Sequence, residues 1–415
     1  MKEMKTYKLG DICTIYGRIG FRGYTTEDLT DVKEEGAISL SPTNIIDGEL
    51  DLSKPTYIKW DKYYESPEIM IQSNDIVIVK TGSSIGRTTL IRTVPHPMTL
   101  NPQLVVLKNI KINPLFLSYL IKTREFQGAM QSITVGSAIP TLSQKNLASL
   151  LITIPSDSTQ LKIVNILNAL DNKILINKRI NDNLEQQAQA LYKSWFVDFE
   201  PFCEEEFIET SLGSIPAGWK VGQLSDICEI VGGGTPSKSH PEYYCSRGIA
   251  WITPKDLSVS KSKFSSRGSE DITSDGYKNS SAKLMPRGTV LFSSRAPIGY
   301  ISIATNEICT NQGFKSAVPG IAGTGYLYYF LQANTDKIES KASGSTFKEA
   351  SGSLMKTLEV IIPADGILEQ FEAELAPILN KQENIAREIQ TLTTLRDTLL
   401  PKLMSGELNI NEIDC

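Results

Sequence analysis

The sequence predicts an α+β protein with two β-rich domains in a tandem pseudo-repeat, separated by two long helices that form an intramolecular antiparallel coiled coil. Three observations support this fold class: an internal repeat, short β-branched runs within each copy, and a heptad pattern after each copy. The chain has 415 residues, which is too long for one ordinary hydrophobic core, so at least two domains are expected.

The second half of the chain repeats the first half in the same order. Three pairs of segments match, at offsets of 215, 213 and 208 residues: "LGDICTIYG" (9–17) with "LSDICEIVG" (224–232), "NDIVIVKTGSSIGRTTLI" (74–91) with "RGTVLFSSRAPIGYISIA" (287–304), and "GSAIPTLSQKNLASLLITIP" (136–155) with "GSTFKEASGSLMKTLEVIIP" (344–363). The middle of each copy differs most. Two copies of one scaffold with dissimilar loops suggest one task performed on two different targets.

Most signals within each copy are those of strands. Runs such as "DIVIVK", "LVVLK" and "LEVIIP" are short, β-branched and bounded by Gly, Pro, Asn or Asp. Short helices are expected at 113–130 and 325–340. Each copy is therefore predicted to be α+β with sheet dominant.

After each copy the period changes to that of a coiled coil. Apolar residues recur at alternating spacings of three and four, and this seam contains Leu167, Leu170, Ile174, Leu184, Leu191 and Trp195, then Leu375, Ile378, Ile385, Ile389, Leu392, Leu399 and Leu403. Polar residues interrupt the seam at Asn177, Asn181 and Gln382. Because a narrow apolar seam needs a partner, the two helices are predicted to pair; the alternative is that each lies on its own domain.

These patterns give a division of the chain into six parts. The predicted parts are a first domain at 1–157, a central helix at 158–199, an acidic linker at 200–214, a second domain at 215–365, a C-terminal helix at 366–407 and a tail at 408–415.

Charge is distributed unevenly along the chain. The net charge is −5, but residues 236–300 carry ten Lys and Arg against five Asp and Glu, which leaves −10 for the remainder. A basic surface on an acidic chain is compatible with specific DNA binding. The alternative is a solvated face with chance enrichment.

Several classes of site are not expected. Two proline-flanked histidines, His96 and His240, and six cysteines without a C-x-x-C pair argue against a zinc site, a disulfide framework or a histidine base. "VGGGTPS" (231–237) lacks the lysine of a phosphate-binding loop. No signal peptide or membrane span is expected, so a cytoplasmic location is predicted.

Five segments resemble signature segments of the specificity subunit of Type I restriction–modification enzymes. They are "LYKSWFVDFEPF" (191–202), "IPAGWKVGQLSDICEIVGGGTPS" (215–237), "IAWITPKDLS" (249–258), "ASGSTFKEAS" (342–351) and "LRDTLLPKLMSGEL" (395–408). The resemblance extends to the whole chain through its plan of two domains and two helices. It is denser in the second half, and residues 18–73 match no motif.

The resemblance implies a function without chemistry in this chain. Such a subunit has two target recognition domains, each reading one half of a bipartite sequence in double-stranded DNA, and its helices set the spacer between the half-sites. Its partners are two modification (methyltransferase) subunits, which methylate adenine N6, and restriction or motor subunits. S-adenosylmethionine, ATP and Mg would belong to those partners, and no cofactor, metal or catalytic residue is expected here.

Candidate DNA-binding residues are donors in loops. Equivalent loops after one strand of each copy supply Lys80, Ser83, Ser84 and Arg87, then Ser293, Ser294 and Arg295. A second loop supplies Thr346 and Lys348, and the dissimilar loops supply Arg18, Arg22, Lys238 and Lys255. The alternative for the equivalent loops is a tight turn whose hydroxyls bond to its own backbone.

Three aromatic residues fall off the seam at the end of the central helix. Phe196, Phe199 and Phe202 are predicted to form an apolar docking surface for a modification subunit; the alternative is packing on the neighbouring domain. Three other functions remain open: a self-contained methyltransferase, which lacks its motifs here, a protein-binding scaffold, and a stand-alone repressor.

Overall fold

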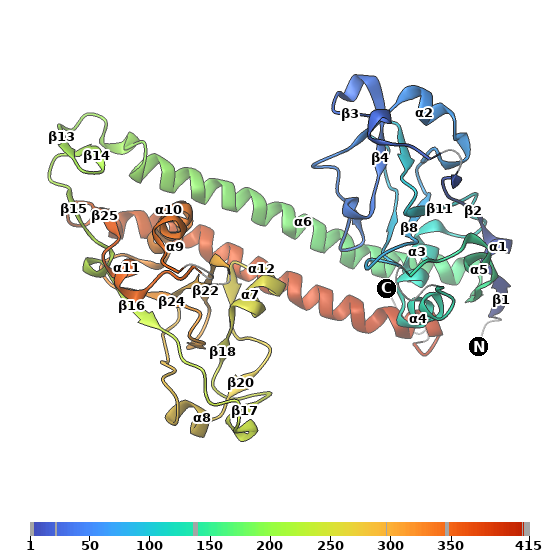
Figure 1. Cartoon of the computed structure of the whole chain (residues 1–415). Coiled ribbons are helices and arrows are strands. Elements are labelled where there is room, and N and C mark those ends of the chain that lie inside the picture. Colours follow the sequence, from blue (N-terminus) through green and yellow to red (C-terminus); the bar gives the residue numbers. More distant parts are fainter. Residues whose placement is uncertain are drawn as a thin grey trace. The chain divides into compact units, whose positions relative to one another are not determined.

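The computed structural model of the chain describes residues 4–20, 23–135, 140–295, 297–344, 348–408 and 410. The chain forms two compact units, Met1–Ile174 with Leu392–Cys415, and Leu175–Thr391. Two long helices, α6 (Asp157–Phe196) and α12 (Ile367–Ser405), each contribute residues to both units. Each unit therefore contains one copy of the repeat and a part of each long helix (Figure 1).

The first unit is built around two four-stranded sheets, with strand orders β2-β11-β8-β9 and β10-β4-β7-β3. Its strands are β1 (Lys5–Lys8), β2 (Thr14–Tyr16), β3 (Leu29–Thr30), β4 (Gly36–Leu40), β5 (Ile45–Ile46), β6 (Glu49–Leu50), β7 (Tyr57–Lys59), β8 (Ile76–Val79), β9 (Thr88–Leu90), β10 (Met98–Leu100), β11 (Leu104–Lys108) and β12 (Leu151–Ile154). Its short helices are α1 (Leu9–Ile12), α2 (Trp60–Tyr64), α3 (Pro114–Lys122), α4 (Arg124–Ser132) and α5 (Gln144–Ser149).

The second unit has a five-stranded sheet with the order β16-β24-β21-β22-β19 and several two-stranded sheets. Its strands are β13 (Phe207–Thr210), β14 (Gly213–Pro216), β15 (Lys220–Gln223), β16 (Cys228–Gly232), β17 (Tyr244–Cys245), β18 (Trp251–Ile252), β19 (Phe264–Ser265), β20 (Asp271–Ile272), β21 (Val290–Ser294), β22 (Ile298–Ala304), β23 (Cys309–Thr310), β24 (Lys315–Pro319) and β25 (Glu359–Ile362). Its short helices are α7 (Pro254–Ser260), α8 (Ser274–Lys278), α9 (Thr324–Ala333), α10 (Thr335–Lys341) and α11 (Gly352–Lys356).

The two repeats share the central part of their topology, as the matching segments predict: the strand order β2-β11-β8-β9 recurs as β16-β24-β21-β22, to which β19 adds a fifth strand. In each copy the first and last strands pair antiparallel, β1 with β12 and β15 with β25, and one parallel pair occurs at equivalent positions, β10 with β4 and β18 with β23. The L-x-D-I-C segment forms a short helical turn in both copies, an α-helical turn at Leu9–Ile12 and a 3₁₀ turn at Leu224–Asp226. The thiols of Cys13 and Cys228 donate to the carbonyl oxygens of Leu9 and Leu224, at sulfur–oxygen distances of 3.4 and 3.3 Å.

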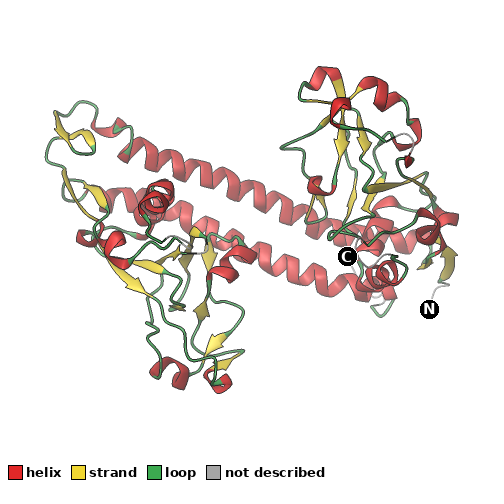
Figure 2. Ribbon diagram, in the orientation of Figure 1, coloured by secondary structure: helices red, strands yellow, loops and turns green. Residues whose placement is uncertain are grey.

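The sheet β2-β11-β8-β9 of the first unit and the sheet β16-β24-β21-β22-β19 of the second have buried side chains on both faces. Figure 2 shows the strands of each unit together with its helices. Side chains along a strand point alternately to opposite faces, so Ile76 and Ile78 pack on one side of β8 and Val77 and Val79 on the other. The side with Ile76 and Ile78 belongs to the core that includes the long helices. In the second unit, Val290 and Phe292 of β21 take the same position toward the helices.

Within each unit, α6 and α12 run antiparallel. In the first unit Asp171 of α6 binds Arg396 of α12 at 2.9 Å, and residues 163–167 share a core with Leu403. In the second unit Trp195 meets Phe371 with ring centroids 5.7 Å apart, whereas residue 181, earlier on α6, meets residue 382, later on α12. Later residues of α6 therefore contact earlier residues of α12, as antiparallel helices require.

The predicted seam residues face inward to different degrees. The buried members are Leu167, Ile174, Trp195, Leu375, Ile385 and Leu403, and the partly buried members are Leu170, Leu184, Leu191, Ile378, Ile389, Leu392 and Leu399. Asn177 and Gln382 are also buried. The amide nitrogen of Asn177 has no hydrogen-bond partner within the described part of the chain.

The aromatic residues at the end of α6 differ from the expected docking surface. Phe196 and Phe202 are buried in the core of the second unit, and Phe199 packs against the same core. The ring of Phe196 lies 4.8 Å from that of Phe371, and the ring of Phe202 lies 4.9 Å from that of Trp219. These side chains join α6 to α12 and to the neighbouring domain, so they offer a partner little surface.

The acidic stretch after these aromatics, expected to be a linker, contains ordered structure. It contains a short 3₁₀ helix, Glu200–Phe202, and then the hairpin of β13 and β14. Phe207 and Ile208 of this hairpin remain exposed. None of the helices in the described part of the chain has the length and apolar composition that a membrane span requires.

Candidate nucleic-acid interface

The two kinds of loop proposed from the repeat meet in each unit. In the first unit the loop after β8 bonds to the segment before α5: the Gly82 amide donates to the Pro140 carbonyl at 3.3 Å, and the Leu142 amide donates to the Lys80 carbonyl at 2.8 Å. In the second unit the Ala350 amide donates to the Ser294 carbonyl at 2.9 Å. Segments far apart in sequence therefore lie side by side at equivalent positions in both copies.

A glycine at the end of each hairpin loop explains part of the repeat pattern. Gly86 and Gly299 have φ angles of +86° and +98°, a region that L side chains rarely adopt. A Cβ atom at these positions would lie 2.7 Å from the side-chain oxygen of Gln127 and 2.4 Å from a methyl carbon of Thr335. The turn must therefore stay narrow in both copies.

In the first unit the loop presents donors to solvent. Ser83 and Arg87 are exposed, Ser84 is partly exposed, and Lys80 is half-buried. Burial lowers the pKa of the Lys80 amine. A glycine turn with hydroxyls and two cations can approach a phosphate closely, so these four residues remain candidates.

In the second unit the two serines have another role. Ser293 and Ser294 are fully buried, and their hydroxyls donate to the carbonyl oxygens of Pro297 and Gly313 at 2.9 and 3.1 Å. Ser293 bonds to the backbone of its own turn, which was the alternative interpretation, whereas Ser294 bonds to a carbonyl 19 residues further along the chain. Arg295 is partly exposed and lies 3.6 Å from the Glu349 carboxylate.

Arg18 is also not placed to read DNA in this structure. Its side chain is buried, its Nε donates to the Leu100 carbonyl at 3.0 Å, and its Nη2 donates to the Thr99 hydroxyl at 3.2 Å. The guanidinium carbon lies 5.2 Å from the centroid of the Tyr24 ring. Arg18 therefore ties its loop to β10.

The remaining candidates are exposed lysines. Lys238 lies 4.1 Å from the centroid of the Tyr244 ring and 3.5 Å from the Glu270 carboxylate. Lys255 is exposed in the first turn of α7, and Lys348 is exposed in the second loop. Arg22 and Thr346 lie outside the described residues.

One arginine was missed by the sequence analysis. Arg267 is partly exposed, and its Nη1 donates to the carboxylate of the buried Asp271 at 2.8 Å. It borders a surface hollow of about 280 Å³, lined also by Gly248, Ile249, Ala250, Leu284, Asn306 and Glu307. The available signal was an arginine four residues before an aspartate, inside the basic stretch.

The geometry of this arginine suits base recognition. The Gly248 amide also donates to the Asp271 carboxylate, at 2.9 Å, so the carboxylate is fixed from two sides. A guanidinium held by a fixed carboxylate keeps its other N–H groups in a planar fork, which matches the O6 and N7 acceptors of guanine. Asn306 adds an amide to the same hollow.

No group of three or more His, Cys, Asp or Glu is arranged to hold a metal ion in the part of the chain that the structure describes. The described cysteines, Cys13, Cys203, Cys228, Cys245 and Cys309, are free thiols.

Comparison with known proteins identifies the family. The family described as Type I restriction modification DNA specificity domain matches twice, at residues 1–186 and 216–401. The chain belongs to this family. It is a DNA-binding specificity subunit of a Type I restriction–modification system, with tandem recognition domains, and it recognises DNA sequence.

One relative aligns with part of this subunit and another with almost all of it. The Type I restriction enzyme MjaIX specificity subunit of Methanocaldococcus jannaschii is 43% identical over 165 residues, which are 39% of this chain and 38% of that protein. The Type I restriction enzyme HindI specificity subunit of Haemophilus influenzae is 26% identical, over 98% of this chain and 100% of that protein.

A solved structure shares the fold. The S subunit of the Type I restriction–modification system of M. genitalium aligns over 97% of this chain and 96% of its own length, with a TM-score of 0.62 and 14% identity. The α+β class with two tandem domains and long helices is therefore confirmed.

Proposed function

We propose that this specificity subunit reads a bipartite target in double-stranded DNA, one half-site with each recognition domain. It directs partner adenine-N6 methyltransferase subunits and ATP-dependent restriction subunits to that target in the cytoplasm, and performs no chemistry itself. The observation that supports the proposal is a pair of recognition domains that share a central strand order, β2-β11-β8-β9 and β16-β24-β21-β22, and carry different exposed side chains.

Comparing the two domains suggests which segments contact phosphates and which read bases. The hairpin loop has a glycine at positive φ in both copies, which supports a shared task such as phosphate contact. The hollow beside Arg267 lies in the segments where the two copies differ in sequence. Direct base reading, which must differ between two half-sites, fits these dissimilar segments.

The long helices are proposed to set the spacer and to dock two methyltransferase subunits. Since Phe196 and Phe202 are buried, docking needs another apolar surface. Leu175, Ile176 and Ile180 are exposed on α6 and provide one.

The decisive experiment is to co-express the chain with a candidate methyltransferase subunit and map N6-methyladenine in the host DNA. The expected result is one motif with two short half-sites around a fixed unspecified gap. Exchanging one recognition domain then assigns each half-site. Absence of new methylation from a soluble, verified complex contradicts the proposal and leaves a protein-binding coiled-coil scaffold or a stand-alone repressor.

A further inference from the structure

A tyrosine at the equivalent position of each repeat donates a hydrogen bond to a carboxylate of α6. In the first unit the Tyr119 hydroxyl of α3 donates to Asp171 at 2.6 Å. In the second unit the Tyr329 hydroxyl of α9 donates to Glu185 at 3.1 Å. The two tyrosines lie at the same helical position, six residues after the N-cap residues Asn113 and Gly323.

Each carboxylate also binds a cation, but the cations come from different places. Asp171 binds Arg396, which belongs to α12. Glu185 binds Lys263, which belongs to the recognition domain, at 2.5 Å. The second unit therefore has an ion pair between its recognition domain and α6, in addition to the tyrosine.

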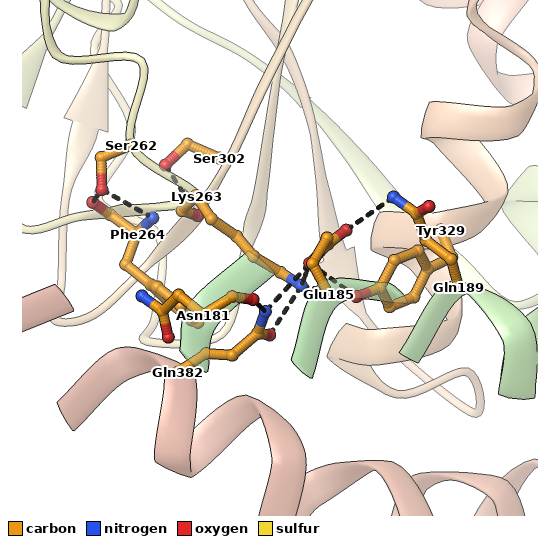
Figure 3. A network of polar contacts seen from close by, with 9 residues as sticks. All are labelled: Asn181, Glu185, Gln189, Ser262, Lys263, Phe264, Ser302, Tyr329 and Gln382. Carbon is orange, nitrogen blue, oxygen red and sulfur yellow. Dashed lines mark hydrogen bonds and ion pairs between the residues drawn. The ribbon is translucent and has the colours of Figure 1, made fainter. Parts of the chain in front are cut away.

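The group around Lys263 joins three elements (Figure 3). The Lys263 ammonium also donates to the Tyr329 oxygen at 2.5 Å and to the side-chain oxygen of Gln382 on α12 at 2.9 Å. The Gln382 amide nitrogen donates back to Glu185 at 3.0 Å and to the Asn181 carbonyl at 3.4 Å. One polar group thus holds the recognition domain, α6 and α12 together.

The backbone of Lys263 is fixed as well. Its carbonyl accepts from the Ile303 amide at 2.7 Å and from the Ser302 hydroxyl at 3.1 Å, both on β22. The Lys263 side chain therefore extends from a backbone that is held against β22 of the sheet.

The group is largely removed from water. The side chain of Lys263 is 13% exposed and that of Glu185 is 24% exposed. Burial lowers the pKa of Lys263, and the pairing with Glu185 opposes this shift. Burial alone would raise the pKa of Glu185, but Lys263 and the hydrogen bonds from Lys263 and Gln382 outweigh it and leave that pKa below its ordinary value.

Such a group fixes a position in a way that apolar packing does not. Hydrophobic contacts are non-directional, whereas a buried ion that loses its partner is strongly destabilised. The residues four positions from Glu185 on α6, Asn181 and Gln189, carry no charge, and Asp182, three positions before Glu185, is exposed. A shift of the recognition domain along α6 by one turn would therefore remove Lys263 from its partly buried carboxylate partner.

We propose that Lys263, Glu185, Tyr329 and Gln382 are positioning residues that hold the second recognition domain at one setting on the helix pair of its unit. They thereby narrow the range of spacer lengths that the subunit accepts. This inference rests on the proposed bipartite function.

The test uses the full chain assembled with its methyltransferase subunit. Plasmid targets carry the mapped half-sites with the native spacer or with one base pair more or less, and methylation of each is measured. Lys263→Met and Glu185→Gln should reduce the preference for the native spacer by about tenfold, the size expected when a coupled buried pair is broken. The half-site sequences should not change.

Matched controls separate positioning from general effects. Asp182→Asn on α6 and Lys381→Met on α12 alter exposed residues of the same helices and should retain the native preference. The double variant Lys263→Met with Glu185→Gln should lose no more preference than either single variant, because the two act on one contact.

A milder variant and a second measurement keep the proposal testable if Lys263→Met does not fold. Tyr329→Phe removes one hydroxyl and retains the ring, and it should broaden spacer choice less than Lys263→Met does. Amide hydrogen exchange should rise in α9 and in residues 263–265 of Lys263→Met before global unfolding.

The outcomes for the two proposals are distinct. A folded, methylating Lys263→Met or Tyr329→Phe complex with unchanged spacer preference and unchanged exchange overturns the inference. If the wild-type complex methylates no bipartite target, the proposed function fails. In that case, unchanged amide hydrogen exchange in Lys263→Met would reject the positioning role as well, and raised exchange in that variant would support it.

Discussion

At the scale of single residues, the partner of an arginine decides what the arginine does. Arg18 donates hydrogen bonds to a backbone carbonyl and a hydroxyl inside the first unit. Arg267 is instead oriented by Asp271 at the border of an open hollow. Both lie in loop-like sequence, Arg18 between glycines in "YGRIGFRG" (16–23) and Arg267 among serines in "SSRGSE" (265–270). Only the fold determines which carboxylates and carbonyls surround each guanidinium.

Arg267 is predicted to read one base pair of the second half-site. Replacing it with alanine should cost about 1–3 kcal/mol of binding and relax one position of the methylated motif. Arg267→Lys should rescue poorly, because an ammonium cannot reproduce the planar fork. Sequencing of methylated sites provides the measurement, with Lys381→Met as the control. An unchanged motif in Arg267→Ala would exclude this residue.

Glu185 is predicted to make the second unit sensitive to acid. Its pKa in the folded chain lies below the ordinary value of 4.5, so its carboxylate adds stability above that pH. This contribution decreases as the pH falls through the lowered pKa. Thermal unfolding followed by circular dichroism from pH 7 to pH 3 should show a flatter pH profile for Glu185→Gln than for wild type, while Asp182→Asn should follow wild type. Identical slopes in all three proteins would contradict the assignment.

At the scale of secondary-structure elements, the end of α6 both pairs with α12 and packs on the second recognition domain. The sequence predicts the first of these contacts but not the second. The heptad pattern predicts Trp195 as an inward residue, and the structure places it against Phe371. The pattern does not predict the burial of Phe196 and Phe202, which lie off the seam. Phe196 packs on Phe371 of α12 and on Tyr326 of the recognition domain, and Phe202 packs on Trp219 of that domain.

Phe196→Ala is predicted to destabilise the second unit by about 3–5 kcal/mol, the usual cost of removing a buried phenylalanine. Chemical denaturation measures this effect. Phe207→Ala, in an exposed position of the β13–β14 hairpin, is the matched control and should change stability by less than about 0.5 kcal/mol. A Phe196→Ala protein that unfolds like wild type but no longer binds the methyltransferase subunit would restore the docking role.

The elements could be predicted well from sequence where a pattern is local. The L-x-D-I-C turns, the β-branched strands and the heptads depend on spacing along the chain, and the repeat supplies each of them twice. The candidate site was harder to predict. The burial of Ser293 and Ser294 depends on carbonyl oxygens of other residues in the fold, and the Arg267 hollow depends on segments more than 30 residues apart.

At the scale of the whole molecule, the two long helices are the only regular elements within the described residues that extend from one unit into the other. Their antiparallel register is set in each unit by specific pairs, Asp171 with Arg396 and Glu185 with Gln382. Lengthening one helix alone cannot preserve both pairs. Lengthening both helices by the same number of residues can preserve both.

A matched insertion is therefore predicted to lengthen the spacer. Seven residues inserted after Ile174 in α6 and seven inserted after Thr391 in α12 add two helical turns and about 10.5 Å. At about 3.4 Å per base pair of B-DNA, the gap between half-sites should grow by about three base pairs, with both half-sites unchanged. Mapping of N6-methyladenine measures the gap. Insertion into α6 alone should abolish methylation or unfold one unit, since one of the two register pairs must break. A folded double-insertion complex that retains the original gap would show that the helices do not set the spacer.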